Sequence, residues 1–147
     1  MKLLVLNGPN LNYLGKRDPE QYGSETLSDI EKTLQDRYSD IDFIFIQSNH
    51  EGDLIEAIHS AKSGTIDGLV ANWGGFTHSS VAIHDALELI DIPKVEVHLS
   101  NIHAREEFRE RSITGRAMDG IITGFGINSY LLGVEAVQQL SAKNLID

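Results

Sequence analysis

Short apolar runs alternate with segments of helical periodicity along the whole chain, and this alternation constrains the fold more than any other feature. The pattern predicts strands at residues 2–6, 41–47, 68–71, 94–99 and 120–123, and helices at about 27–38, 52–63, 81–90 and 129–142. Such an order is typical of βα units on a parallel sheet. A chain of 147 residues has room for one substantial core. We therefore predict one α/β domain over residues 1–147, with a five-stranded parallel sheet.

The same pattern predicts caps and buried faces. Thr26 and Asp29 are spaced as a capping box for the first helix. The second strand is apolar on both faces, as expected of a strand buried on both sides. The third helix carries the apolar residues Val81, Ala82, Ala86, Leu89 and Ile90. The last helix is expected to bury Leu131, Leu132, Ala136, Val137 and Leu140.

A long polar connection follows the first strand. Residues 6–23 read LNGPNLNYLGKRDPEQYG, which is about three times the usual two to six residues of a strand-to-helix loop. The stretch holds three asparagines, the Lys16-Arg17 pair and Tyr22. We interpret it as a lid or wall of a site, with a structural loop bearing a solvated basic pair as the alternative.

Polar residues also gather where the predicted strands end. They lie at Asn7 and Asn10, at 47–51, at 72–78 and at 98–101. In sheets of this kind, ligands bind outside the carboxyl ends of the strands. The agreement among the four clusters predicts a site at this edge of the sheet.

Glu96 and His98 are the strongest candidates for chemistry within these clusters. The fourth strand alternates, so both side chains leave the same face with α-carbons about 6.5 Å apart. A carboxylate at that distance can reach the imidazole and fix its tautomer, which suits a general acid. The alternative is a hydrogen-bonded detail at a strand end. His78 and Asn72 face the same rim.

Composition excludes several classes of protein. The net charge of −10 argues against a nucleic-acid binder, and no run approaches the roughly twenty apolar residues of a membrane span. Without cysteine or a signal-peptide core, we expect a soluble cytoplasmic protein. Four arginines at 105, 109, 111 and 116 allow a local anion site, although acidic residues between them also fit a charged helix face.

Resident cofactors are not expected. No recognised spacing of metal ligands is present, so we predict no metal. The turn that begins at Asn7 does not open directly into a helix, as a flavin or dinucleotide phosphate loop would. The first and third strands end in Asn7 and Asn72, where a magnesium-dependent phosphoacceptor module would carry acidic residues.

Taken together, the motifs resemble those of the type II 3-dehydroquinate dehydratases. They are LNGPNLNYLGKRDPEQYG at 6–23, QSNHEG at 47–52, FTHSS at 76–80 and EVHLSN at 96–101, followed by Arg105 and Arg109. The resemblance implies a flavodoxin-like three-layer αβα domain that assembles as a dodecamer of four trimers. It also implies a cofactor-free shikimate-pathway enzyme that dehydrates 3-dehydroquinate to 3-dehydroshikimate.

The resemblance further implies catalytic roles. Tyr22 would be the base that takes the proton from carbon 2, and Arg17 would keep its phenolate charged. His98, oriented by Glu96, would protonate the hydroxyl that leaves carbon 1. Asn10 would hold a water against the enolate oxygen.

Substrate-binding roles follow from the same resemblance. The residues that would grip the hydroxyls and the carboxylate are Asn72, His78 and Arg109, with the backbone of Leu99 and Ser100. Asp85 looks like the residue that reaches the site of a neighbouring subunit. From the sequence alone it is a solvated helix position.

One loop departs from the family pattern. Where the family usually reads N-P-G-A, this chain has Asn72-Trp73-Gly74-Gly75. We expect the loop at 72–76 to be looser than the family norm, unless packing of Trp73 orders it. Two other functions compete: an enzyme for another carbonyl compound with an α-proton, and a small-anion sensor on the same fold. The paired Glu96-His98 and Arg17-Tyr22 sets favour the enzyme.

Overall fold

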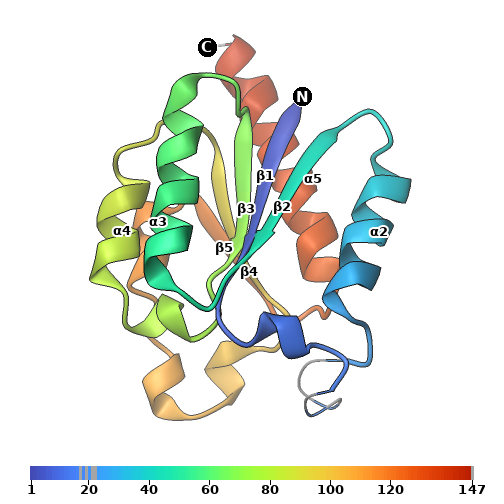
Figure 1. The fold of residues 1–147 in the computed structure, drawn as a ribbon, viewed down its shortest axis with the longest axis vertical. Helices are drawn as coiled ribbons and strands as arrows, with labels where there is room; N and C mark the ends of the chain where they lie inside the picture. The colour runs from blue at the N-terminus through green and yellow to red at the C-terminus, as the bar shows by residue number, and fades with distance from the viewer. Residues whose placement is uncertain (17, 19, 21–22, 147) are drawn as a thin grey trace.

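The computed structural model describes residues 1–16, 18, 20 and 23–146, with side chains up to residue 143. The strands are β1 (Lys2–Asn7), β2 (Asp42–Gln47), β3 (Gly68–Asn72), β4 (Lys94–His98) and β5 (Gly120–Thr123). They form one parallel sheet in the order β2-β1-β3-β4-β5 (Figure 1). This order is that of flavodoxin-like sheets, so the predicted fold class is confirmed.

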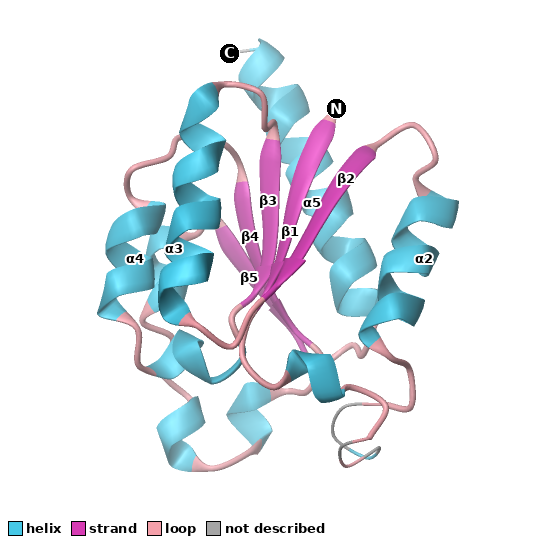
Figure 2. Cartoon of the chain, in the orientation of Figure 1, coloured by secondary structure: helices cyan, strands magenta, loops and turns pink. Residues whose placement is uncertain are grey.

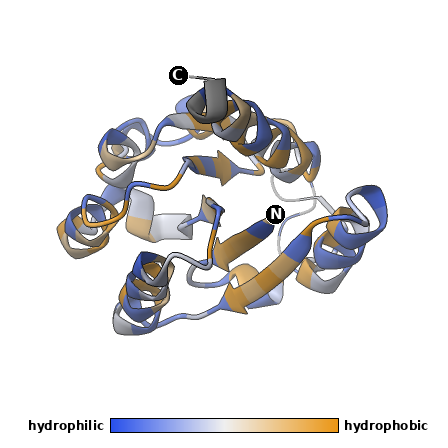
Figure 3. Ribbon diagram, turned by 90° about the horizontal axis from the view of Figure 1, so that it is seen from above, coloured by the Kyte–Doolittle hydropathy of each residue, from blue (hydrophilic) through white to orange (hydrophobic). Residues whose placement is uncertain are grey.

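Helices cover both faces of the sheet. They are α2 (Leu27–Arg37), α3 (Glu51–Ser60), α4 (Val81–Leu87) and α5 (Asn128–Ile146). Along β1, Leu3 and Val5 join the apolar core under α2 and α5, while Leu4 and Leu6 join the core under α3 and α4. Successive strand residues point to opposite faces, which is why one strand serves both cores. Figures 2 and 3 show these three layers, and the hydropathy colours of Figure 3 show apolar residues along the strands and on parts of the helices.

Local signals for helix ends match the structure. The Thr26 hydroxyl accepts the Asp29 N–H, and the Asp29 carboxylate accepts the Thr26 N–H, so the predicted capping box is confirmed. Gly64 adopts a φ of 85° just after the short 3₁₀ helix that extends α3. None of the described helices is long and apolar enough to span a membrane.

The prediction that the second strand is buried on both faces is wrong. β2 lies at the edge of the sheet, and its residues are half-buried or exposed. An edge strand has a neighbour on one side only, so the apolar run of β2 meets less of the core. Apolar character predicted the strand correctly but not its position in the sheet.

Leu132, which the sequence predicts to be buried, lies outside the core, and so do two apolar residues of the segment predicted as the third helix. Val81, Leu89 and Leu132 are 58%, 51% and 43% exposed. α4 is only seven residues long, and it turns Ile83 inward instead of Val81. The face that a short helix buries depends on how it meets the sheet, which its own apolar pattern only approximates.

The loop after β3 packs Trp73 into the core. This side chain is fully buried, and residues Gly74–His78 form a 3₁₀ helix behind it. A Cβ on Gly8 would lie 2.2 Å from the Trp73 carbonyl oxygen, so the turns after β1 and β3 are in direct backbone contact. The Asn72 Oδ1 accepts the Gly74 N–H at 3.1 Å. These contacts support the alternative expectation, in which Trp73 packing replaces the constraint of a proline, and the looseness of the loop stays a prediction.

Candidate active site

A cavity of about 190 Å³ lies at the carboxyl ends of β1, β3 and β4. It occupies the edge of the sheet where the sequence predicted a site. The lining residues are Pro9, Asn10, Leu11, Asn72, Gly74, Gly75, His78, His98, Leu99, Ser100, Ile102, Arg105 and Arg109. Histidine, asparagine and arginine side chains from strand ends and from separate loops therefore converge on one small volume, which is the usual form of a small-molecule site.

The predicted Glu96-His98 pair is present in β4. Glu96 is fully buried, and its Oε2 lies 2.8 Å from His98 Nε2. A carboxylate oxygen accepts hydrogen bonds, so Nε2 carries the proton that joins the two groups. His98 also lines the cavity. The other ring nitrogen, Nδ1, is thereby left for a ligand in the cavity.

The Glu96 carboxyl is stabilised in its ionised form. Burial alone raises its pKa, but hydrogen bonds from His98, Thr114 and Thr77 outweigh burial and bring the pKa below its ordinary value. Thr77 and Thr114 donate to its two oxygens at 2.6 Å and 2.5 Å. A negative charge is thus held next to the His98 imidazole.

His78 has a defined tautomer as well. Its Nδ1 lies 2.8 Å from the carbonyl oxygen of Arg111, so Nδ1 donates and carries a proton. Burial lowers the pKa of His78, and the nearby charges of His98 and Arg109 lower it further, against the opposing effects of the Arg111 carbonyl and Glu96. At neutral pH the ring is therefore neutral, and Nε2 is an acceptor on a residue that lines the cavity.

Asn72 is held from behind by Tyr130 of α5. The Tyr130 hydroxyl donates to Asn7 Oδ1 at 2.5 Å and accepts from Asn72 Nδ2 at 3.1 Å. Burial raises the pKa of Tyr130, so it remains a neutral phenol at physiological pH. With Oδ1 bonded to the Gly74 N–H, the Asn72 amide has a fixed orientation. Its second Nδ2 hydrogen is left to face a ligand.

The turn after β1 places Asn10 at the cavity. Asn10 has a φ of 70°, a left-handed conformation that asparagine tolerates better than most residues. Its N–H donates to Asn49 Oδ1 at 3.0 Å, and Gln47 Nε2 donates to the Gly8 carbonyl at 3.2 Å. The ends of β1 and β2 are thus joined beside the cavity.

Two arginines lie on the opposite wall. Arg109 Nε pairs with Glu106 and its guanidinium lies 5.0 Å from the centre of the Phe108 ring. Arg105 Nη1 lies 3.4 Å from Ser100 Oγ. Two guanidinium groups beside the cavity make this wall suitable for an anion such as a carboxylate. Arg105 belongs to a sequence motif but received no role from the sequence.

Among the described site residues, Asp85 lies away from the cavity. Asp85 is exposed on α4 and lines a separate apolar hollow of about 370 Å³, together with Val81, His84, Arg111, Ile113 and Arg116. Arg17 and Tyr22 lie outside the described residues. Their roles stay predictions.

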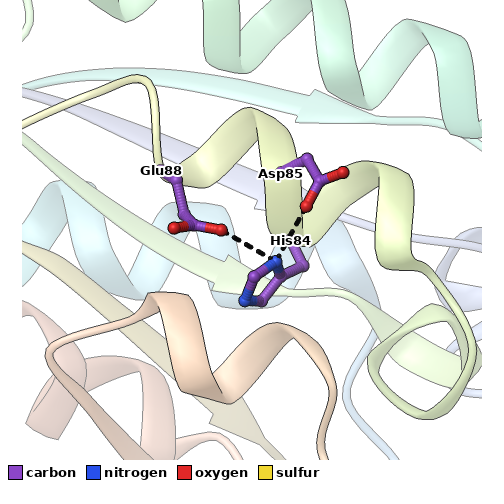
Figure 4. Close-up of side chains that lie close together, drawn as sticks. All are labelled: His84, Asp85 and Glu88. Atoms are coloured by element: carbon purple, nitrogen blue, oxygen red, sulfur yellow. Dashed lines mark hydrogen bonds and ion pairs between the residues drawn. The ribbon is translucent and has the colours of Figure 1, made fainter.

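Among the described residues, one group has the composition of a metal site: His84, Asp85 and Glu88 on and just after α4 (Figure 4). The His84 Nδ1 lies 3.1 Å from Asp85 Oδ1 and 3.2 Å from Glu88 Oε1. Both carboxylates thus approach the same ring nitrogen, which fits a shared hydrogen bond from Nδ1. The two carboxylates are largely exposed, and we assign the group no metal.

Sequence reasoning missed four polar residues behind the cavity: Thr77, Ser112, Thr114 and Tyr130. Thr77 belongs to the FTHSS motif, which was the only available signal. The others bond to partners 16 to 123 residues away in the chain. No spacing pattern in the sequence marks such contacts.

Comparisons with known proteins match one family over nearly the whole chain. The family model "Dehydroquinase class II" matches residues 1–138. A 3-dehydroquinate dehydratase of Thermotoga petrophila is 51% identical over 141 residues, covering 95% of this chain and 96% of that protein. One of Rhizobium johnstonii is 49% identical over 142 residues, covering 95% and 97%.

Solved structures agree with this chain in three dimensions. The type II dehydroquinase from Butyrivibrio crossotus superimposes with a TM-score of 0.91 at 41% identity, over 94% of this chain and 97% of that one. The type II dehydroquinase from Propionibacterium acnes gives 0.87 at 38% identity, over 96% of each chain.

Proposed function

The chain belongs to the class II dehydroquinase family, and from this premise we propose that it is a hydro-lyase that converts 3-dehydroquinate to 3-dehydroshikimate in the shikimate pathway. We propose that residues 1–147 form a single catalytic domain. The observation that carries the proposal is the buried Glu96-His98 pair, which opens onto a cavity lined by Asn72, His78 and Arg109.

The reaction removes a proton from carbon 2 and a hydroxyl from carbon 1. In our proposal, the Tyr22 phenolate takes the proton next to the ketone, and the charge moves onto the ketone oxygen as an enolate. The enolate then collapses, the bond between carbon 1 and oxygen breaks, and His98 donates a proton so that water leaves. Arg17 keeps Tyr22 ionised. Before the next turnover, Tyr22 releases the proton that it took from carbon 2 to solvent, and His98 takes up a proton from solvent.

His98 is suited to this step by its surroundings. Nε2 is bonded to Glu96, so the proton for the leaving hydroxyl comes from Nδ1. The ionised carboxylate accepts the Nε2 hydrogen before and after this transfer, so the ring keeps its orientation. Asn10, at the cavity beside the end of β1, is proposed to hold a water against the enolate oxygen.

Substrate binding uses the other lining residues. Asn72 offers an N–H and His78 offers Nε2 as an acceptor, which together suit two substrate hydroxyls. We assign the carboxylate to the backbone N–H groups of Leu99 and Ser100, with Arg109 on the same wall.

We also propose a cytoplasmic homododecamer of four trimers. The position of Asp85 supports an assembly. Asp85 lies outside the active-site cavity of its own subunit and would complete the site of a neighbouring subunit. Light scattering is therefore expected to show a mass of trimers or of a multiple of trimers. A fully active monomer would contradict both the assembly and the role of Asp85.

The direct test is an assay with 3-dehydroquinate, which follows the ultraviolet absorbance of the conjugated enone in the product. Activity is expected without added cofactor and should be unchanged by a chelator. Borohydride in the presence of substrate should not inactivate the enzyme, because no described strand ends in a lysine that could form an imine. Inactivation by borohydride would indicate a Schiff-base mechanism instead.

A small-anion sensor on the same fold is the competing proposal. It would bind the substrate carboxylate at Arg105 and Arg109 without turnover. Binding of 3-dehydroquinate with no enone product would favour the sensor. Turnover of a different carbonyl compound with an α-proton, but not of 3-dehydroquinate, would favour an enzyme with another substrate.

A further inference from the structure

Three hydroxyl groups surround the buried carboxylate of Glu96, and we call Thr77, Ser112 and Thr114 the hydroxyl cluster. Thr77 and Ser112 approach Glu96 Oε2 at 2.6 Å and 3.1 Å, and Thr114 approaches Oε1 at 2.5 Å. The hydroxyls also lie 2.7 Å and 2.8 Å from one another around Thr77. None of the three residues lines the cavity.

The number of hydrogen-bond donors around Glu96 fits an ionised carboxylate. Each hydroxyl has one hydrogen to donate, and a carboxylate has about four acceptor positions. Thr114 serves Oε1, while Thr77 and His98 Nε2 serve Oε2. Ser112 accepts the Gly115 N–H at 2.8 Å and keeps its own hydrogen for Glu96 or Thr77. If Glu96 were protonated on Oε1, it would donate to Thr114, and the Thr114 hydrogen would turn from Glu96 to Thr77 Oγ1 at 2.7 Å.

The hydroxyl cluster also joins two segments that form walls of the cavity. Thr77 lies in the 3₁₀ helix after β3, whereas Ser112 and Thr114 follow the arginine-bearing segment after β4. The Ile113 N–H donates to the Thr77 carbonyl at 2.7 Å. This contact closes the backbone around Glu96, so the carboxylate cannot rotate away without losing partners on both segments.

We propose that the hydroxyl cluster is a positioning device that keeps Glu96 charged and directs its Oε2 to His98 Nε2, so that His98 Nδ1 faces the reacting hydroxyl. The role rests on the proposed function, since it acts through His98 as the proton donor. The titratable groups recorded beside Glu96 are His98 of the same strand and His78 of the 3₁₀ helix, and Arg109 of the facing segment lies near His78.

Isosteric variants separate the hydroxyl from its shape. Thr114→Val and Thr77→Val each remove one donor, and each should lower kcat about 10-fold or more with a smaller change in KM. Losses of this size are usual in metalloenzymes when a residue that orients a metal ligand is replaced. Thr114→Ser and Thr77→Ser keep the hydroxyl and should retain most of kcat. Equal losses in the Val and Ser variants would overturn the proposal.

The dependence of kcat on pH distinguishes the proposed role from a packing defect, which would not shift the profile. Removing a donor raises the pKa of Glu96, so the acid limb of kcat should shift upward by about one pH unit in the Val variants. In a Glu96→Gln enzyme, adding Thr114→Val should leave the acid limb of the kcat profile where it is. The added change should also lower kcat only slightly, because the hydroxyls act through the carboxylate that this enzyme lacks. An equal loss in both backgrounds would show a merely structural role.

Ser112 has a matched control in Ser129. Both serine hydroxyls accept a backbone N–H, from Gly115 and from Phe125 respectively, but Ser129 lies outside the cluster. Ser112→Ala should lower kcat and shift its acid limb, whereas Ser129→Ala should change stability alone. Identical pH profiles for the two variants would contradict a role for Ser112.

Unfolding experiments test the cluster without any substrate. The folded pKa of Glu96 lies below its unfolded value of about 4.5, so the stabilisation is present above pH 4.5 and is lost as the pH falls through the folded pKa. The difference in unfolding free energy between the parent and Thr114→Val should therefore narrow from pH 7 to below pH 4.5. A difference independent of pH would overturn the inference. If it narrows while the parent fails to turn over 3-dehydroquinate, the proposed function fails and the cluster's action on Glu96 stands.

Discussion

Tyr22→Phe is expected to lower kcat by about three orders of magnitude or more while substrate still binds, because the change removes the proposed proton acceptor. An unperturbed tyrosine has a pKa near 10, so it is a poor base at neutral pH. Stabilising the phenolate by two to three pKa units requires roughly 3 to 4 kcal/mol. One guanidinium in a water-excluded site can supply most of this, and Arg17 is the proposed source.

Steady-state kinetics with 3-dehydroquinate, together with substrate binding by calorimetry, would test this expectation. Tyr13→Phe is the matched control, because Tyr13 lies in the same connection, is exposed and does not line the cavity. It should leave kcat unchanged. A Tyr22→Phe enzyme within tenfold of the parent would remove Tyr22 as the base.

The pH dependence of an Arg17→Ala enzyme tests whether the base is a phenolate. Without its guanidinium, the residual rate should climb with pH as the Tyr22 phenolate forms unaided. If the pH profile of the variant simply tracks that of the parent, Arg17 binds substrate instead, and the assignment of Tyr22 as phenolate loses its physical support.

His98→Gln is expected to lower kcat by two to four orders of magnitude, the usual loss when a general acid is removed. Glutamine is chosen because its amide N–H can still donate to Glu96, so the buried carboxylate keeps a partner. An alanine would leave that acceptor short of a donor and would confuse lost chemistry with lost stability. KM should change much less than kcat, since the proton is transferred in the transition state.

His59→Gln provides the comparison for this variant. His59 is exposed on α3 and does not line the cavity, so the same substitution there should leave kcat and KM unchanged. A His98→Gln enzyme with a raised KM and a nearly normal kcat would mean that His98 only binds substrate. The leaving hydroxyl would then need another proton donor.

Local sequence signals predicted most of the fold. Strand and helix periods and the capping box at Thr26 depend on residues close together in the chain, and they are found in the structure. The errors concern position within the whole. β2 is an edge strand, and Leu132 faces outward, because burial depends on which neighbours a segment meets.

The candidate site divides in the same way. The alternation of β4 alone predicted that Glu96 and His98 share a face, and the common rim of parallel strands predicted that Asn72 and His78 lie near them. The resemblance to the family added Tyr22 and Arg17, which stay predictions. None of these signals indicated which nitrogen of either histidine faces the cavity.

The sequence by itself thus determined the strands, their common rim and the pairing of Glu96 with His98, because each follows from the repeat of a strand or from parallel connections. Only the tertiary structure decided what holds that pair. Thr114 lies 18 residues from Glu96, and Tyr130 lies 123 residues from Asn7. Hydrogen bonds across such separations have no period in the sequence, so the orientation of Glu96 and of the Asn72 amide emerges only when the segments pack together.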